Sequence, residues 1–173
     1  MAFGKNYGKH ESQRVGIFVD VQNMYYSAKN LYDGAKVDFG EILKAAVSKR
    51  QLIRALAYVI RAEVGEEQAF YDALEKQGYE VMAKDLQVFA GGAKKGDWDV
   101  GMAVDAIRAA DKLDTIVLVT GDGDFASLVD YLQNNKGCRV EVIAFGRTCS
   151  SKLVEEADDF LDLDENSDKF LIR

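Results

Sequence analysis

The chain has 173 residues, no proline, and a net charge of −7 from 22 Lys and Arg against 29 Asp and Glu. With 48% hydrophobic and 29% charged residues, it is long and apolar enough to bury one sizeable core, which argues against a disordered chain. No apolar run approaches the roughly 18 residues of a membrane span, and residues 1–10 hold no secretory signal, so we expect a cytoplasmic protein without a membrane partner.

Strand-like and helix-like segments alternate along the chain. A polar N-terminal arm over 1–13 precedes them. The strands are expected from short apolar runs, and the helices from spacings of three and four between apolar residues. We predict strands at 15–19, 52–60, 79–83, 115–119, 139–144 and 160–163, and helices at about 21–33, 39–49, 66–77, 98–111, 124–134 and 153–157.

This alternation predicts an α/β fold, with a mainly parallel sheet and helices on both of its faces. Residues 85–96 read as a polar, Gly-rich loop that can hold an edge strand at 86–89. Residues 155–168 hold eight acidic residues and no basic one, which is typical of a solvated face or tail. The eight negative charges of that stretch exceed the net charge of −7, so the rest of the chain is not acidic. The net charge therefore does not exclude a phosphate-rich partner.

Carboxylates stand where three predicted segments reach one edge of the sheet. Asp20 ends the first strand, Asp122 and Asp124 follow the strand at 115–119, and Asp99 opens a helix. In open α/β sheets, ligands bind at the carboxyl ends of the strands. Clustered carboxylates raise each other's pKa unless a cation lies among them, and oxygen-only ligands suit Mg²⁺ or Mn²⁺.

Each acid also has a purely structural interpretation. An Asp at a strand end often caps the next helix, as Asp97 can cap the helix that begins near Asp99. The Gly-Asp-Gly at 121–123 can be a simple turn. Asp105 falls roughly 120° off the helix face of Asp99 and about 9 Å further along, so we assign it a supporting or structural role. The coincidence of three acidic sites is what favours a cation site.

Other catalytic groups are scarce. His10 is the single histidine and lies in the N-terminal arm, while Cys138 and Cys149 are too few for a disulfide framework or a thiolate metal site. No Cys-His or Ser-His-Asp set is available. Catalysis would therefore rest on carboxylates, a cation and water, an arrangement suited to phosphate chemistry.

Three motifs carry a resemblance to a known family. The segments FVDVQN (18–23), KGDWDVGMAVD (95–105) and LVTGDGDF (118–125), supported by residues 142–146, 150–153 and 157–160, resemble the NYN domain family. They look like its LabA-like branch, whose folds are similar to PIN-domain nucleases. The resemblance covers roughly residues 14–163, which we treat as the domain, with a C-terminal tail over 164–173.

The resemblance implies a Rossmann-like three-layer sandwich of about five or six strands and a Mg²⁺- or Mn²⁺-dependent ribonuclease site. Many PIN domains carry a further acid, usually Glu, on a helix after the first strand, and this sequence shows no clear match for it. The implied catalytic and metal-binding residues are Asp20, Asp99, Asp122 and Asp124, supported by Asn23, Asp97, Asp105 and Thr120.

Candidate substrate contacts are less specific. Trp98 can stack on a base or pack in the core. Lys84 and Lys95 can contact phosphates or simply be solvated. Arg147 and Ser150, after the 139–144 strand, can bind phosphate or cap a helix. We expect RNA as the partner, and glycine-rich edges with exposed aromatic residues leave a homodimer open. The candidates are Lys84, Lys95, Trp98, Arg147 and Ser150.

Three functions compete on these residues. The first is a metal-dependent ribonuclease that hydrolyses phosphodiesters with a cation-activated water. The second is a non-catalytic RNA-binding or regulatory module on the same fold, consistent with the missing acid. The third is a haloacid-dehalogenase-type phosphatase, which would need an acid two residues after Asp20, where Gln22 stands.

Overall fold

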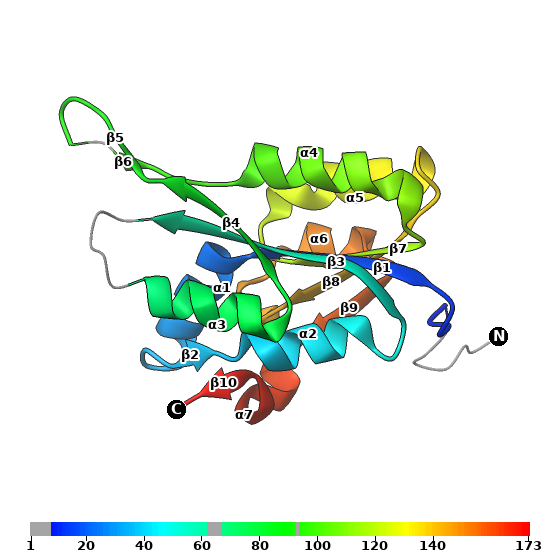
Figure 1. Cartoon of the computed structure of the whole chain (residues 1–173), viewed down its shortest axis with the longest axis horizontal. Helices are drawn as coiled ribbons and strands as arrows, with labels where there is room; N and C mark the ends of the chain where they lie inside the picture. Colours follow the sequence, from blue (N-terminus) through cyan, green and yellow to red (C-terminus); the bar gives the residue numbers. More distant parts are fainter. Residues whose placement is uncertain (1–7, 62–66, 93) are drawn as a thin grey trace.

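A six-stranded parallel sheet forms the centre of the molecule, in the order β4-β3-β1-β7-β8-β9 (Figure 1). The computed structural model of the protein describes residues 8–61, 67–92 and 94–173, except the side chains of residues 94 and 95. The strands are β1 (Arg14–Asp20), β3 (Gln51–Arg61), β4 (Glu80–Asp85), β7 (Thr115–Val119), β8 (Arg139–Ala144) and β9 (Asp159–Asp162).

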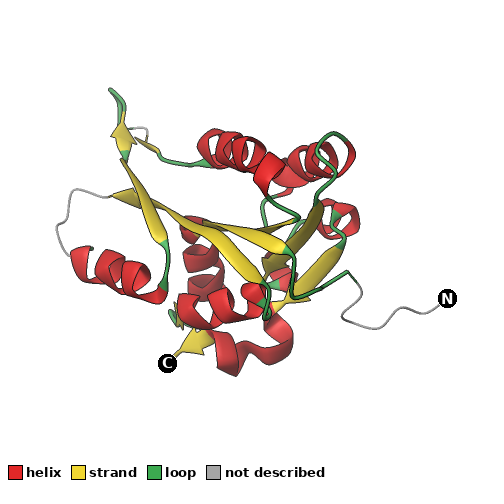
Figure 2. Ribbon diagram, turned by 45° about the vertical axis from the view of Figure 1, so that its right-hand side comes forward, coloured by secondary structure: helices red, strands yellow, loops and turns green. Residues whose placement is uncertain are grey.

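Helices cover both faces of this sheet (Figure 2). One face carries α1 (Val21–Leu31), α2 (Phe39–Val47) and α3 (Gln68–Gln77). The other carries α4 (Asp99–Ala109), α5 (Ala126–Asn134) and α6 (Ser151–Glu156). The predicted parallel α/β sandwich is therefore confirmed.

The alternation of strand side chains explains why the sheet has two cores. In β1, Ile17 and Val19 pack toward α1 and α2, while Phe18 between them packs toward α4 and α5. All three are fully buried. Successive side chains of a strand point to opposite faces, so an uninterrupted apolar run is what a strand covered on both sides requires.

Several helix boundaries differ from those predicted because a 3-10 turn adjoins the helix. The predicted helix at 124–134 begins as η2 (Gly123–Phe125) before α5, and the one at 98–111 ends as η1 (Ala110–Lys112) after α4. The predicted short helix at 153–157 starts two residues earlier, as α6. The start of the predicted helix at 66–77 lies partly outside the described residues.

The predicted edge strand at 86–89 belongs to a separate hairpin. β5 (Gln87–Val88) pairs with β6 (Lys94–Lys95) in a two-stranded antiparallel sheet that projects from the end of β4 (Figure 1). Gly91 and Gly92 have positive φ angles of 95° and 86°, a conformation that glycine adopts without a steric penalty. The turn between the two strands therefore depends on these glycines.

The segment at 164–173, expected to be a tail, is packed on the domain. It forms η4 (Leu163–Asn166), α7 (Ser167–Phe170) and β10 (Leu171–Ile172), and β10 pairs with β2 (Lys36–Val37). Phe170 and Leu171 are buried against the core on the α1–α2 side. Burial of these apolar side chains accounts for the departure from the expected tail.

Part of the acidic stretch at 155–168 is structural rather than solvated. The carboxylates of Asp158, Asp162 and Asp164 accept hydrogen bonds from the backbone amides of Val140, Gly146 and Arg147, respectively, at 2.8–2.9 Å. At the other end of the chain, residues 1–7 of the predicted flexible arm lie outside the described residues. Lys9, within that arm, forms an ion pair with Asp159 at 3.2 Å.

Candidate metal centre and active site

The carboxyl ends of β1 and β7 form the floor of the candidate site. The two strands are parallel neighbours, with Val19 aligned to Val119, so the residues that follow them meet at one edge. Asp20 ends β1 and caps α1, where its carboxylate accepts the backbone amide of Asn23 at 3.2 Å. A strand-end aspartate thus serves as a helix cap while facing the ligand edge.

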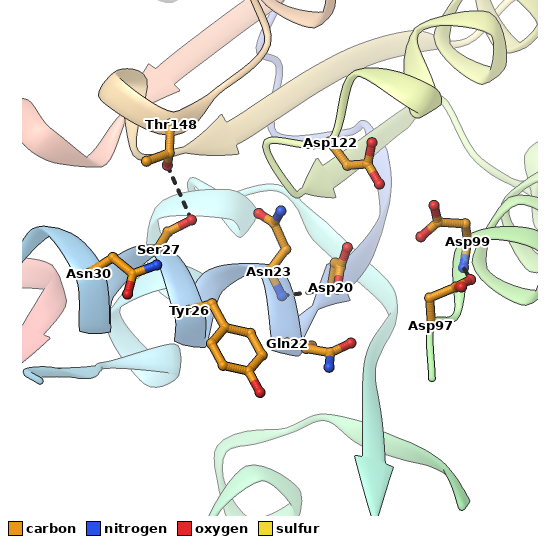
Figure 3. Close-up of a pocket in the computed structure, with 10 residues that line it drawn as sticks. All are labelled: Asp20, Gln22, Asn23, Tyr26, Ser27, Asn30, Asp97, Asp99, Asp122 and Thr148. Atoms are coloured by element: carbon orange, nitrogen blue, oxygen red, sulfur yellow. Dashed lines mark hydrogen bonds between the residues drawn. The ribbon is translucent and has the colours of Figure 1, made fainter. Parts of the chain in front are cut away.

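A cavity of about 600 Å³ opens at this edge. Figure 3 shows Asp20, Asp99 and Asp122 on one side of it, with Tyr26, Ser27 and Asn30 of α1 farther from these acids than Gln22 and Asn23. This volume lies within the range of small-ligand sites. Its lining consists of Asp20, Gln22, Asn23, Tyr26, Ser27, Asn30, Asp97, Asp99, Asp122 and Thr148.

Three carboxylates lie within metal-binding distance of one another. Asp99, Asp122 and Asp124 each offer an oxygen, and these oxygens lie within 4.8 Å of one another. Burial and the adjacent Asp122 raise the pKa of Asp99 to about 7. Burial also raises the pKa of Asp20, and its hydrogen bonds from Asn23 and Thr120 only partly oppose this. The negative charges are therefore crowded, as expected for a site that gains from a cation.

Two neutral side chains hold the acidic turns in place. Thr120 donates its hydroxyl to Asp20 at 3.2 Å, and the same oxygen accepts the backbone amide of Asp122 at 3.2 Å. Asn23 accepts the backbone amide of Gly121 at 2.9 Å. The two predicted supporting residues thus connect the end of β1 to the turn after β7.

A family model of the NYN domain matches residues 14–164. The chain belongs to the NYN domain family.

A curated NYN-domain relative is the low amplitude and bright protein LabA of Synechococcus elongatus. It is 26% identical over 160 residues, which cover 88% of this chain and 84% of LabA. The crystal structure of a protein of unknown function from Vibrio parahaemolyticus is similar, with a TM-score of 0.85 and 35% identity. That match covers 95% of this chain and 99% of the Vibrio chain, so the two folds correspond over nearly the whole molecule.

In this NYN domain, Asp97 and Asp105 have different surroundings. Asp97 lines the cavity, and its carboxylate accepts the backbone amide of Asp99 at 3.1 Å at the start of α4. Asp105 accepts the hydroxyl of Tyr58 at 2.8 Å and is not among the residues that line the cavity. Asp105 therefore bears on the site only through the packing of α4.

Trp98 is held by the protein itself. Its indole N–H donates to the carbonyl of Val59 at 2.9 Å, and its ring packs edge-on against Tyr58 with centroids 5.2 Å apart. The ammonium of Lys84 lies 4.8 Å from the Trp98 ring centroid. Of the two interpretations, packing rather than base stacking matches these contacts.

Arg147 and Ser150, two of the remaining predicted substrate contacts, are not among the residues that line the cavity. Arg147 donates to Asp164 at 3.3 Å and lies over the ring of Tyr32. Ser150 precedes α6, and its backbone amide donates to the carbonyl of Gly121. The side chain of Lys95 lies outside the described residues, so its predicted phosphate contact stays a prediction.

The sequence interpretation missed most of the neutral lining. Gln22, Tyr26 and Asn30 face the cavity from α1, four residues apart and therefore on one face of the helix. Their spacing of four residues, on the helix that Asp20 caps, is the signal that could have identified them. Neutral polar residues at this spacing are, however, equally typical of a solvent-exposed helix face.

A second, mainly apolar cavity of about 380 Å³ lies between α4 and α5 and shares Asp99 with the first. Val100, which lines this cavity, and Val104 are exposed residues of α4. The homodimer suggested by the glycine-rich edges and exposed aromatic residues stays a prediction. Within the described part of the chain, no helix combines the length and apolar character needed to cross a membrane.

Proposed function

We propose that this NYN domain is a ribonuclease that depends on Mg²⁺ or Mn²⁺. The observation that carries the proposal is the convergence of Asp20, Asp99, Asp122 and Asp124, which come from three chain segments and meet at one sheet edge. Members of the NYN and PIN-like families are typically nucleases, and the chain is homologous to LabA across most of its length.

The donor set fits a hard divalent cation. All of the clustered donors are carboxylate oxygens, and burial together with the neighbouring Asp122 carboxylate raises the pKa of Asp99. Asp99, Asp122 and Asp124 would hold the ion, with Asp20 facing it from the end of β1. A bound cation at such a site supplies an activated water and neutralises charge on a phosphodiester.

The chain's own residues supply orientation. Thr120 bonds both Asp20 and the amide of Asp122, so the two acidic turns keep a fixed separation. Asp97 secures the first turn of α4 through the amide of Asp99. Such hydrogen bonds fix a donor set before the ligand binds, which reduces the cost of assembling it.

Cleavage of a mixture of single-stranded RNAs with Mn²⁺ or Mg²⁺ tests the proposal. We expect Asp122→Asn to lower the rate at least about 100-fold, because a ligand to the catalytic ion is lost. Asp105→Asn is the matched control, since that carboxylate lies outside the cavity lining and Asn can still accept from Tyr58. Equal cleavage by the wild type and Asp122→Asn would contradict a metal-dependent ribonuclease.

Binding of the same RNAs, measured beside their cleavage, distinguishes the second candidate function. Among the described residues that line the cavity there is no glutamate, which favours a non-catalytic RNA-binding or regulatory module. Such a module would bind RNA equally well with EDTA and in Asp122→Asn, without cleavage. Binding that requires the divalent ion would count against it.

A further inference from the structure

The cavity extends beyond the acids along one face of α1, and we refer to this extension as the α1 trough. Its members are Gln22, Tyr26 and Asn30, and it is flanked by Ser27 and Thr148, whose hydroxyls are hydrogen-bonded at 3.1 Å (Figure 3). From position 22 to position 30 the helix rises about 12 Å. That length spans about two or three nucleotides of a single strand at roughly 3.4 Å or more each.

The hydrogen-bonding groups of the trough are unused by the protein. The side-chain amides of Gln22 and Asn30 and the hydroxyl of Tyr26 make no hydrogen bond within the described part of the chain. Amide and phenol groups can each both donate and accept. They therefore suit a ligand that presents donors and acceptors side by side.

The trough also lacks positive charge. No lysine or arginine is among the described residues that line the cavity. The nearest predicted phosphate contacts are engaged elsewhere, because Lys84 lies over Trp98 and Arg147 is paired with Asp164. A phosphate group offers only acceptors and a negative charge, so the trough is poorly suited to bind phosphates directly.

We propose that the α1 trough binds the sugar hydroxyls and base edges of single-stranded RNA beside the scissile phosphate, through uncharged hydrogen bonds. This inference rests on the proposed function, in which the divalent ion is the anchor for the phosphate. A ribose 2′-hydroxyl both donates and accepts, and unpaired base edges do the same. In a duplex the base edges are occupied, so the trough selects single strands.

Two adjacent tyrosines provide a matched pair of variants. Tyr25 and Tyr26 are each 49% exposed, but only Tyr26 lines the cavity. Tyr→Phe at either position removes one hydroxyl and preserves the contact between their rings. We expect Tyr26→Phe to weaken binding about threefold to tenfold, the loss of one uncharged hydrogen bond, and Tyr25→Phe to leave it unchanged.

Binding is measured by fluorescence anisotropy with a short fluorescein-labelled RNA of randomised sequence, with Ca²⁺ replacing Mg²⁺ to slow turnover. The same oligonucleotide with 2′-deoxy sugars should bind the wild type several-fold more weakly. In the double variant Gln22→Ala, Asn30→Ala this preference for RNA should decrease, because the side-chain amides that would hydrogen-bond the 2′-hydroxyls have been removed. The proposal that the trough binds RNA would be overturned if Tyr25→Phe and Tyr26→Phe had equal affinities and the double variant kept the full preference for RNA.

Salt dependence gives an independent measurement. Each contact between a basic side chain and a phosphate contributes about −0.7 to the slope of log affinity against log salt for single strands. With the divalent ion held constant, we expect a slope shallower than about −1.4, the value for two such contacts. A steeper slope would contradict a trough that binds RNA through uncharged contacts, whereas full binding in EDTA would contradict the divalent ion as the anchor for the phosphate.

The two proposals fail in different ways. If the wild type binds RNA with the predicted tyrosine difference but never cleaves it, the trough survives and the ribonuclease is contradicted. If the wild type cleaves RNA and both tyrosine variants bind it equally well, RNA binding by the trough is contradicted and the proposed ribonuclease activity is supported. If the wild type neither binds nor cleaves single-stranded RNA, both are overturned.

Discussion

The side-chain oxygen of Asn23 accepts a hydrogen bond from the backbone amide of Gly121 at 2.9 Å, joining two turns that are 98 positions apart in the chain. Asn23 also donates its own backbone amide to Asp20. A Cβ atom at position 121 would lie 3.1 Å from the Cα of Cys149, so the loop after β8 closes against the same turn. One neutral side chain thus positions acids that otherwise repel one another.

We expect Asn23→Ala to weaken Mn²⁺ binding about 10-fold or more, because the amide of Gly121 loses its partner and the turn bearing Asp122 can shift. Isothermal titration calorimetry measures this directly. Asn30→Ala on the same helix is the control, since its side chain lies in the trough and bonds neither acidic turn. Unchanged affinity in Asn23→Ala would show that the two turns hold their positions without it.

Removal of the Asp99 charge should stabilise the metal-free protein. Burial and Asp122 raise the pKa of Asp99 from 3.8 to about 7, so the folded state binds a proton more tightly than the unfolded state. The free energy of unfolding therefore falls as the pH rises from about 4 to 7. Because Asp99 is partly exposed, we expect Asp99→Asn to gain only about 1 kcal/mol at pH 8, or about 2–4 °C in Tm.

Thermal unfolding in EDTA and in Mn²⁺ measures both parts of this prediction. In EDTA the variant should unfold at the higher temperature at pH 8, and the difference should vanish near pH 4. In Mn²⁺ the order should reverse, because the wild type gains binding energy that the variant lacks. If the Tm of the wild type did not change on addition of Mn²⁺, the result would be inconsistent with a metal centre.

The acids could be predicted from sequence because their positions follow from elements with strong local signals. Asp20 and Asp122 directly follow the buried runs of β1 and β7, and parallel strands place their carboxyl ends together. Tyr26 and Asn30 gave no such signal, since only the packing of α1 beside the acidic turns distinguishes their face from solvent. The pairing of Leu171 with Val37 was equally hidden, because two-residue strands carry no periodicity.

A buried ion pair escaped prediction for a related reason. Arg50 and Glu141 are 1% and 6% exposed in their side chains, and Arg50 donates to both carboxylate oxygens, at 2.8 and 3.0 Å. Lysines and arginines are rarely buried, so the sequence favours an exposed Arg50. The partner becomes evident only once the fold brings the turn between α2 and β3 next to β8.

This pair should determine the acid stability of the fold. Burial alone would raise the pKa of Glu141, but hydrogen bonds from Arg50 and Arg139 outweigh it and the pKa is lowered. A lowered pKa contributes stability above the unfolded value of about 4.5, and this is lost as the pH falls through the folded pKa. We expect Glu141→Gln to cost about 3–5 kcal/mol in urea unfolding at pH 7, because Arg50 is left buried without a counter-charge.

The exposed pair of Arg14 and Asp114 is the control for Glu141→Gln. Both side chains are at least 40% exposed and are joined at 3.1 Å. We expect Asp114→Asn to cost less than about 1 kcal/mol, and Glu141→Gln to flatten the loss of stability below pH 4.5. Similar costs for the two substitutions would show that burial adds nothing to the Arg50–Glu141 pair.

Gly101 and Trp98 provide a prediction in which packing opposes helix propensity. Gly101 lies inside α4, where Ala normally adds about 0.5–1 kcal/mol of stability. Here an added Cβ would lie 2.6 Å from Cε3 of the Trp98 indole, whose N–H is fixed to Val59. We therefore expect Gly101→Ala to destabilise the protein and to weaken Mn²⁺ binding several-fold, since the start of α4 carries Asp99. Urea unfolding and calorimetry measure the two effects.

The Gly101→Ala effect should depend on the indole. In a Trp98→Leu background, where the smaller side chain leaves room for the new methyl group, the cost of Gly101→Ala should fall by about 1 kcal/mol or more. Val100→Ala on the same turn is the control, because Val100 is 77% exposed and should change neither stability nor Mn²⁺ affinity appreciably. A Gly101→Ala variant that is more stable than the wild type and binds Mn²⁺ equally well would show that Trp98 moves aside freely. The indole would then not position Asp99.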